Sequence, residues 1–418
     1  MGHSAGRWEG DTLVVETVGF NDLGWIGDPS FRLVLGVPQT EKLRITERFR
    51  RLDLGHLEVE TTYDDPNMFK QPFTTRKVRS LAPKDEEVPE YVCNENERDV
   101  AHMKLINSRG SKAMILRTIL IILAAIASAL AQPVQPGELL KEAVAPADHR
   151  ISYGSGELNF GELRLPRSAS GHPLLILVHG GCWADRLPNF DPRATSFELL
   201  RPMAAALAEM GIATWNVEYA RVGNPGGGWP GTFQDLSRAV DYVRTLTKTY
   251  PLDLSRVAVA GHSSGGQLAL WIAARPKLNR SSELYAKDAT NKEGPLRVRA
   301  AIDLDGPPDL ATSQPFERRM CPIPAITDFM GGSPEQFPSR YAEASATPFL
   351  PLGVRQELIS GSLLSGIRPQ LAAYETAARS KGDSITITEL AGSGHFDMLS
   401  PHSPYWKTVS DRIAATLR

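Results

Sequence analysis

The segment "VAVAGHSSGGQLALWIAA" places a serine in a setting suited to nucleophilic chemistry. Gly261, His262, Ser263, Ser264 and Gly265 fit the pattern G-x-S-x-G. An apolar stretch typical of a strand precedes this pattern, and an Ala- and Leu-rich stretch typical of a helix follows it. In that context the glycines permit a sharp turn that lifts a serine hydroxyl above the start of the helix. We therefore predict that Ser263 is a nucleophile rather than part of a merely structural turn.

Two further segments supply the groups that such a serine requires. In "ELAGSGHFDML", His395 follows a predicted strand and lies in a Gly/Ser loop, where it could take the proton of the serine. In "LVHGGCW", a predicted strand ends at His179, and Gly180 and Gly181 follow with backbone N–H groups open to approach. Together with the N–H of Ser264, these groups predict an oxyanion hole for the attacked carbonyl.

The elements that position these residues alternate between strands and helices after residue 132. "PLLILVHGG" and "IATWNVEYA" are typical of buried strands, whereas "ELLRPMAAALAEMG" and "TFQDLSRAVDYVRTLTK" have helical spacing. The alternation continues through "RAAIDLD", "QELISG" and "ITITEL". We therefore expect residues 133–418 to form a mostly parallel sheet with helices on both faces, with its active groups at the carboxyl ends of the strands.

Three motifs spread over roughly residues 150–418 carry a family resemblance. "HGGCW", "GHSSGG" and "GSGHF" resemble the α/β-hydrolase superfamily, specifically the esterase group with an HGGxW oxyanion loop. That group includes arylformamidase-like and feruloyl-esterase-like enzymes. "FMGGSPEQFPSRYAEASATPFLPLG" is also similar to the group and takes the place of a lid-like insertion. The resemblance implies an α/β-hydrolase fold and a serine hydrolase that cleaves carboxylic esters, or a related acyl bond, through an acyl-enzyme on Ser263. It implies no cofactor, and we expect Trp183 to wall the acyl pocket.

One position departs from the pattern of that superfamily. The loop that usually carries the triad acid reads "ISGSLLSGIRP", and Leu364 occupies the acid's place. We expect Asp305 to take this role, because it ends the strand "RAAIDLDG", one strand after the nucleophile. That position lies at the sheet edge from which Ser263 and His395 emerge.

The other acidic residues of the second unit suit the role less well. Asp383 precedes its strand and Glu357 opens one, so both are expected at the opposite edge of the sheet. Asp397 is only two residues beyond the histidine. Asp303 is expected on the other face of its strand from its alternate neighbours, and Asp309 is expected to cap a helix instead.

Alternatives to an ester hydrolase remain open on the sequence alone. An arylformamidase and a peptidase of prolyl-oligopeptidase type would use the same residues. From another class, a non-catalytic binding protein on a decayed hydrolase fold is prompted by Leu364 and by the truncated first unit.

Residues 1–103 have a different character from the rest of the chain. "DTLVVETV", "KLRITERF", "HLEVETTY" and "FTTRKVRS" alternate or nearly alternate apolar and polar side chains, which predicts a small antiparallel sheet. The motifs "GRWEGDTLVVETVGFND" and "YVCNENERD" resemble the C-terminal portion of other bacterial proteins. Because no nucleophile, base and acid converge here, we interpret this unit as a structural fragment of another protein.

Residues 104–132 form a linker that contains a segment similar to a secretory signal. "MILRTILIILAAIASALAQ" carries a positive charge at Arg117, an apolar run over residues 119–127 and an Ala-Leu-Ala site before Gln132. We therefore expect export to the periplasm or beyond, with a mature chain that begins near Gln132. A membrane anchor, if residues 115–131 stay uncleaved, and a buried core helix are the alternatives.

Composition limits the partners of the chain. Over 418 residues, 42% are apolar and 22% charged, which indicates globular units rather than disorder. The net charge of -2 and the lack of a basic run argue against nucleic acid. The nine histidines form no HExxH, and "DLDGPPD" lacks the spacing of a calcium loop. We expect a small-molecule ester or acyl substrate and no metal.

The three cysteines suggest one disulfide bond rather than a disulfide scaffold or a zinc site. Export would place Cys182 and Cys321 in an oxidising compartment, and setting Cys93 aside with the first unit leaves a pair. A bond between them would tie the insertion to the oxyanion loop. Two buried free thiols are the alternative.

Overall fold

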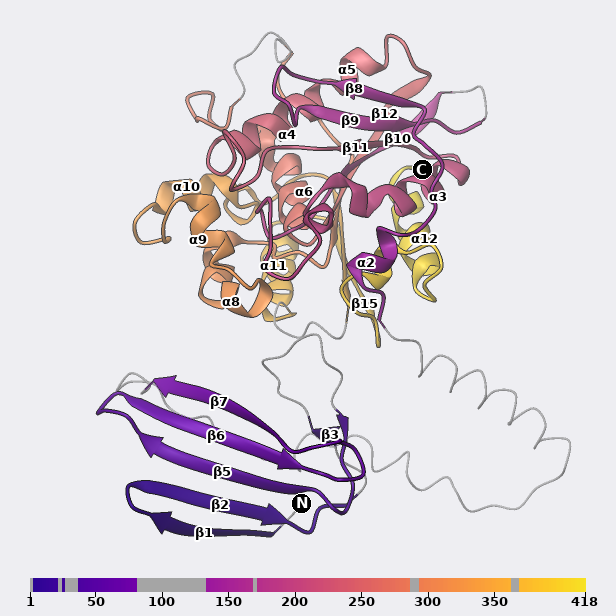
Figure 1. Cartoon of the computed structure of the whole chain (residues 1–418). Helices are drawn as coiled ribbons and strands as arrows, with labels where there is room; N and C mark the ends of the chain where they lie inside the picture. Colours follow the sequence, from indigo (N-terminus) through magenta and orange to yellow (C-terminus); the bar gives the residue numbers. More distant parts are fainter. Residues whose placement is uncertain are drawn as a thin grey trace, which may run out of the picture. The chain divides into compact units, whose positions relative to one another are not determined.

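The computed structural model describes residues 3–21, 25–26, 37–80, 133–167, 171–285, 293–361 and 368–418 (Figure 1). The chain forms two compact units, Met1–Lys112 and Ala113–Arg418. The signal-like segment, its expected boundaries at 103 and 132, Cys93 and Leu364 lie outside the described residues. Within the described ranges, no helix combines the length and the apolar character needed to cross a membrane.

The first unit is the antiparallel sheet that the alternating pattern predicts. One face carries a cross-strand row of Trp8, Leu13, Phe49 and Val59, whereas charged side chains such as Arg48 lie on the other face. The short strands β3 (Trp25–Ile26) and β4 (Val37–Pro38) pair separately. In sheet order, the five main strands are β1 (His3–Glu9), β2 (Thr12–Val18), β5 (Arg44–Arg51), β6 (His56–Asp64) and β7 (Phe73–Ser80).

The second unit is built on one sheet of eight strands, in the order β15-β14-β13-β12-β10-β11-β9-β8. The strands from β15 to β11 run parallel, and β9 and β8 add antiparallel at one edge. The expected mostly parallel sheet is therefore confirmed. Its strands are β8 (His149–Ser152), β9 (Phe160–Arg164), β10 (His172–Val178), β11 (Ala213–Val217), β12 (Leu252–His262), β13 (Ala300–Leu304), β14 (Arg355–Gly361) and β15 (Ile385–Leu390).

Helices cover both faces of this sheet, which explains why its central strands are apolar throughout. In β10, Leu174, Ile176 and Val178 join one core, whereas Leu175 and Leu177 join the core on the other face. All five side chains are fully buried, as the two-residue period of a strand between two helical layers requires.

The two helical layers contribute different side chains to these cores. Phe233 of α4 and Trp271 of α6 belong to the first core, together with Tyr374 of α11. Met203 of α3 and Ile413 of α12 belong to the second. The helices involved are α2 (Pro136–Leu139), α3 (Arg201–Glu209), α4 (Gly231–Asp241), α5 (Val243–Leu246), α6 (Ser264–Ala274), α11 (Arg368–Ser380) and α12 (Trp406–Thr416). Short 3-10 segments are η3 (Pro192–Thr195), η4 (Phe197–Leu200), η5 (Arg275–Lys277), η7 (Gln314–Phe316), η8 (Thr347–Phe349) and η10 (Asp397–Leu399).

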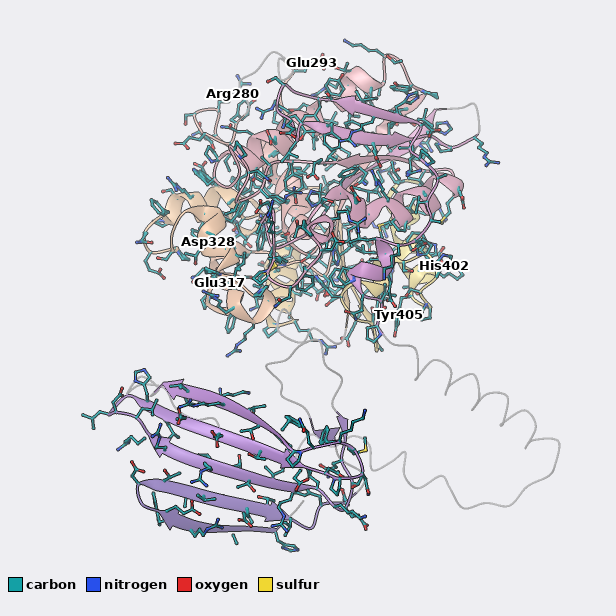
Figure 2. All side chains as sticks on the ribbon, viewed as in Figure 1. Arg280, Glu293, Glu317, Asp328, His402 and Tyr405 are labelled. Atoms are coloured by element: carbon teal, nitrogen blue, oxygen red, sulfur yellow. A yellow bond between two sulfur atoms is a disulfide. The ribbon has the colours of Figure 1, made fainter. Side chains whose placement is uncertain are left out.

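An insertion of short helices lies between β13 and β14. Figure 1 shows α8 to α10 gathered together in orange. The carboxylate of Glu317, labelled in Figure 2, accepts hydrogen bonds from the N–H groups of Ile326 and Thr327, both at 2.8 Å. Because Glu317 is buried, these bonds fix the start of the third helix of the insertion. The helices are α7 (Leu310–Ser313), α8 (Glu317–Met320), α9 (Ala325–Met330) and α10 (Pro338–Ala344).

A disulfide bond joins the insertion to the loop after β10. Cys182 and Cys321 are bonded across a sequence separation of 139 residues, and their Cα atoms are 6.1 Å apart. Both side chains are buried. The cross-link therefore attaches the insertion to the segment that follows Gly181.

Replacing Cys321 with serine is expected to lower the free energy of unfolding by about 2–5 kcal/mol, because the unfolded chain regains the freedom that a long closed loop denies it. Urea unfolding of the variant and of the wild type measures the difference. Adding a reductant to the wild type should bring it to the level of Cys321→Ser. Peptide mapping without reductant that finds both thiols free would contradict the cross-link.

Candidate active site

Ser263 lies in the tight turn between β12 and α6. Its backbone has φ 56° and ψ -124°, a strained conformation that is typical of functional positions. The turn depends on two glycines. A Cβ added to Gly261 would lie 1.8 Å from the Gly265 carbonyl oxygen, and a Cβ added to Gly265 would lie 2.2 Å from the Val178 carbonyl oxygen. The Ser263 N–H donates to the carbonyl of Leu304 at 2.8 Å, which ties the turn to β13.

Asp305 follows β13 directly and meets His395, as the sequence predicts. His395 Nδ1 donates to Asp305 Oδ2 at 2.7 Å. The other carboxylate oxygen accepts from Ser360 Oγ at 2.9 Å and from the Gly361 N–H at 3.2 Å. Because a carboxylate only accepts, this bond places the imidazole proton on Nδ1 and leaves Nε2 free to act as a base. β13 is hydrogen-bonded to β12, so this pair stands at the strand end beside Ser263.

His262 connects the nucleophile turn with the histidine loop. Its ring centroid lies 4.4 Å from that of His395, and its Nε2 donates to the His395 carbonyl at 2.8 Å. Burial holds the pKa of His262 well below its usual value, and the nearby His395 adds to this effect. Within the described residues, Ser263 Oγ has no hydrogen bond to His395. In unliganded enzymes this contact is often long and tightens only with substrate.

The predicted oxyanion loop runs directly against Ser263. An added Cβ at Gly180 would lie 2.6 Å from the His262 carbonyl oxygen and 2.8 Å from Ser263 Cβ. Gly181 has φ 111°, which a residue with a side chain rarely adopts. Ser264 is the first residue of α6, so its N–H lacks an acceptor within the helix. The structure thus places Gly180 and Ser264 beside Ser263, and their role as oxyanion donors stays a prediction.

A buried polar network supports this loop. It was not predicted from the sequence. His179 Nε2 lies 2.8 Å from Glu218 Oε1, and Arg221 donates to the same oxygen at 2.6 Å. Arg221 also donates to the Thr195 carbonyl at 2.8 Å, and the Tyr219 hydroxyl donates to the His179 carbonyl at 2.6 Å. Burial lowers the pKa of His179. Burial opposes ionisation of Glu218, but His179 and Arg221 outweigh it and hold the Glu218 pKa below its usual value.

Trp183 lies between the helix below the nucleophile and the insertion. Its exposed fraction is 2%, its Nε1 donates to Gln267 Oε1 at 3.1 Å, and its ring stacks on Phe329 with centroids 5.5 Å apart. So little of the ring is exposed that its contacts here are with the protein. The role of Trp183 as a wall of the acyl pocket stays a prediction.

The remaining acidic residues have structural partners away from His395. Asp309 caps α7 by accepting from the Thr312 N–H at 3.0 Å, which confirms it as a helix cap. Asp383 accepts from the Leu352 N–H at 2.6 Å. Glu357 is paired with Arg355. Across the described ranges, no group of three or more His, Cys, Asp or Glu side chains is arranged to hold a metal ion.

Asp303 lies in β13 and packs against α6. Its Oδ1 accepts from the Gly306 N–H at 2.7 Å, whereas its Oδ2 has no partner within the described residues. An added Cβ at Gly266 would lie 1.9 Å from Asp303 Oδ1, so the carboxyl group fits tightly against the helix. Burial raises the pKa of Asp303 well above its usual value, and the charge of Asp305 adds to this.

Comparisons with known proteins find several similarities to this chain. A family model described as BD-FAE matches residues 162–352. Esterase LipQ of Mycobacterium tuberculosis is 26% identical over 298 residues, which are 67% of this chain and 62% of LipQ. Kynurenine formamidase of Meyerozyma guilliermondii is 32% identical over 123 residues, which are 29% of this chain and 41% of that enzyme. The matches therefore span less than two thirds of the length of these curated relatives.

Solved structures share the fold of the second unit. A truncated carbohydrate esterase from gut microbiota superposes with a TM-score of 0.53 at 19% identity, over 66% of this chain and 98% of that one. Esterase B from Lactobacillus rhamnosis gives a TM-score of 0.53 at 16% identity, over 74% of this chain and 96% of the esterase. The second unit therefore has the α/β-hydrolase fold, and the chain is similar to esterases.

Replacing Asp303 with asparagine is expected to make folding less sensitive to pH. In the wild type, the raised pKa contributes stability that is complete below the unfolded value of about 3.9 and is lost as pH rises towards the folded value. The free energy of unfolding of Asp303→Asn relative to wild type should therefore rise by up to about 1.4 kcal/mol per pH unit above about pH 4. Denaturant unfolding from pH 4 to 8 measures this.

The matched control for this experiment is Asp328→Asn, because Asp328 is exposed on α9 and keeps its carboxylate in water. Its profile should follow that of the wild type. If the difference in free energy of unfolding between Asp303→Asn and wild type stayed constant with pH, this would contradict a neutral, buried carboxyl group at Asp303.

Proposed function

We propose that the chain is a serine hydrolase that cleaves carboxylic esters through an acyl-enzyme on Ser263. The observation that carries this proposal is the bond between Asp305 and His395 at the strand end beside the strained Ser263 turn. The similarity to esterases supports the ester as substrate class.

The reaction follows from the roles of the site residues. His395 Nε2 takes the Ser263 proton while the serine Oγ forms a bond to the acyl carbon. Negative charge then develops on the carbonyl oxygen, where the N–H groups of the Gly180–Gly181 loop and of Ser264 stabilise it. His395 returns the proton to the leaving alkoxide as the ester C–O bond breaks. Water then attacks the acyl-enzyme by the same steps, releasing the carboxylic acid and restoring the serine.

Asp305 keeps His395 in the tautomer and orientation that this cycle requires. Its carboxylate holds the proton on Nδ1, orients the ring and stabilises the imidazolium that forms when Nε2 takes the serine proton. The donors from Ser360 and Gly361 hold that carboxylate in place. This arrangement supports catalysis over the alternative of a decayed, non-catalytic fold.

Formamide hydrolysis is a second candidate, favoured by the 32% identity to kynurenine formamidase. It uses the same acyl transfer, with an amine rather than an alkoxide as the leaving group. Comparing nitrophenyl esters of short and long acids, feruloyl esters and formyl-kynurenine separates the two, because the preferred substrate has the highest kcat/KM. Export stays a proposal that rests on the signal-like sequence of residues 114–132.

Replacing Ser263 with alanine is expected to abolish labelling by a fluorophosphonate probe and to reduce ester hydrolysis to the background rate, because the attacking oxygen is lost. Gel fluorescence and a nitrophenyl ester assay measure the two effects. Ser380→Ala, at an exposed serine of α11, is the matched control and should be labelled as wild type. Folded wild type that takes no label would overturn the proposed hydrolase.

Replacing Asp305 with asparagine is expected to lower kcat by about 10³ or more with the fold intact, because the amide no longer fixes the proton on Nδ1. Steady-state kinetics and circular dichroism measure activity and folding. Asp309→Asn provides the same substitution at a helix cap, where asparagine is tolerated, and it should keep wild-type kcat. Near-full activity of Asp305→Asn would exclude it as the triad acid.

A further inference from the structure

The chain segment Pro133–Leu139, called the strap below, is bonded to the loop that carries His395. The Val134 N–H donates to Asp397 Oδ1 at 2.6 Å, and the Gly394 N–H donates to Asp397 Oδ2 at 2.7 Å. Gly394 and Asp397 flank His395, and the Asp397 side chain is buried. One carboxylate therefore links the base loop to a segment 263 residues away in sequence.

The strap also packs against this loop and is anchored in the core. An added Cβ at Gly394 would lie 2.7 Å from Pro133 Cβ, so the two backbones are in close contact. Leu139 of α2 has an exposed fraction of 2% and belongs to the same core cluster as Leu399. The Gln135 N–H donates to Glu138 at 2.8 Å and closes the start of α2. The strap is therefore held in a defined position against the histidine loop.

Neighbouring contacts complete the support of the loop. The Tyr405 hydroxyl donates to the Ala391 carbonyl at 3.0 Å, where the loop leaves β15. His402 Nε2 lies 3.1 Å from Glu142, just past the strap. Figure 2 labels both Tyr405 and His402. The strap, the histidine loop and the segment before α12 form one connected cluster.

Asp397 fixes a part of the loop that the other two contacts leave free. Asp305 holds the ring of His395, and His262 holds its carbonyl. Neither contact sets the backbone that enters the loop, which Asp397 fixes through Gly394. Hydrogen bonds to a charged carboxylate are about twice as strong as neutral ones. A shift of about 1 Å in a reacting group can cost about 10²-fold in rate.

We infer that Asp397 is a positioning residue for His395 and that the strap is part of the support on which the base depends. The inference rests on the proposed function, because it concerns the same serine and histidine. Because Asp397 bonds both the strap and Gly394, the position of residues 133–139 sets where His395 Nε2 lies relative to Ser263. Cleavage before Gln132 would leave the strap whole, whereas removal of Val134 would take away its bond to the loop.

Two variants of the full chain test the inference from the two ends of the bond. Val134→Pro removes the N–H donor and leaves the carboxylate, and Val134→Ala is its matched control because it keeps the N–H. Asp397→Asn keeps one acceptor oxygen but turns an amide N–H₂ group towards a donor. We expect Val134→Pro and Asp397→Asn to lower kcat about 10-fold or more, with KM within about threefold of wild type. Val134→Ala should keep wild-type kcat.

The rate of fluorophosphonate labelling of Ser263 provides a readout that lost stability alone would not move. In samples matched for folded protein by circular dichroism, the labelling rate should fall with kcat in Val134→Pro and Asp397→Asn. Labelling and kcat within twofold of wild type in both variants would overturn the role of the strap while leaving the hydrolase in place. Folded wild type without labelling would overturn the proposed function and this inference together.

Discussion

The close packing of three backbone segments around Ser263 is the constraint on which the rest of the second unit depends. The end of β10, the loop at Gly180 and the start of α6 approach so closely that side chains at Gly180, Gly261 or Gly265 would collide with main-chain atoms. At this point the backbone of Ser263 has a positive φ of 56°, and Ser264, the first residue of α6, follows it directly. The apolar strands and the two helical layers fix the sheet edge at which this packing occurs.

Asp305, the proposed triad acid, comes from a different strand end than the one at which the resembled superfamily usually carries this acid. Asp305 stands at the end of β13, and Ser360 and Gly361 at the end of β14 donate to its carboxylate. In the superfamily that the sequence motifs resemble, this strand end usually leads to the triad acid, whereas here it supplies hydrogen-bond donors. β13 and β14 are parallel neighbours, so the ends of the two strands are close enough for Ser360 and Gly361 to donate to Asp305.

The sequence predicts much of this site because strand ends are readable from local patterns. Ser263 and Asp305 directly follow apolar strands, His395 lies in the loop after β15, and parallel strands bring such positions to one edge. The Glu218 network and the bond between Val134 and Asp397 were missed. Their partners lie 39 and 263 residues apart, and the local sequence does not indicate which buried polar groups will meet. The buried charges in "NVEYARV" were the one available signal, because a charge within an apolar run needs a partner.

The disulfide bond divides the proposed catalytic residues into two groups. The segment from Cys182 to Cys321 is a closed covalent ring, and Ser263, Ser264 and Asp305 all lie within it. His395 lies outside, on the free C-terminal arm of the chain. A single peptide-bond break anywhere inside the ring would leave both fragments joined, with Ser263 and Asp305 in one covalent piece. A break between residues 321 and 395 would instead remove the covalent connection between His395 and the other two residues.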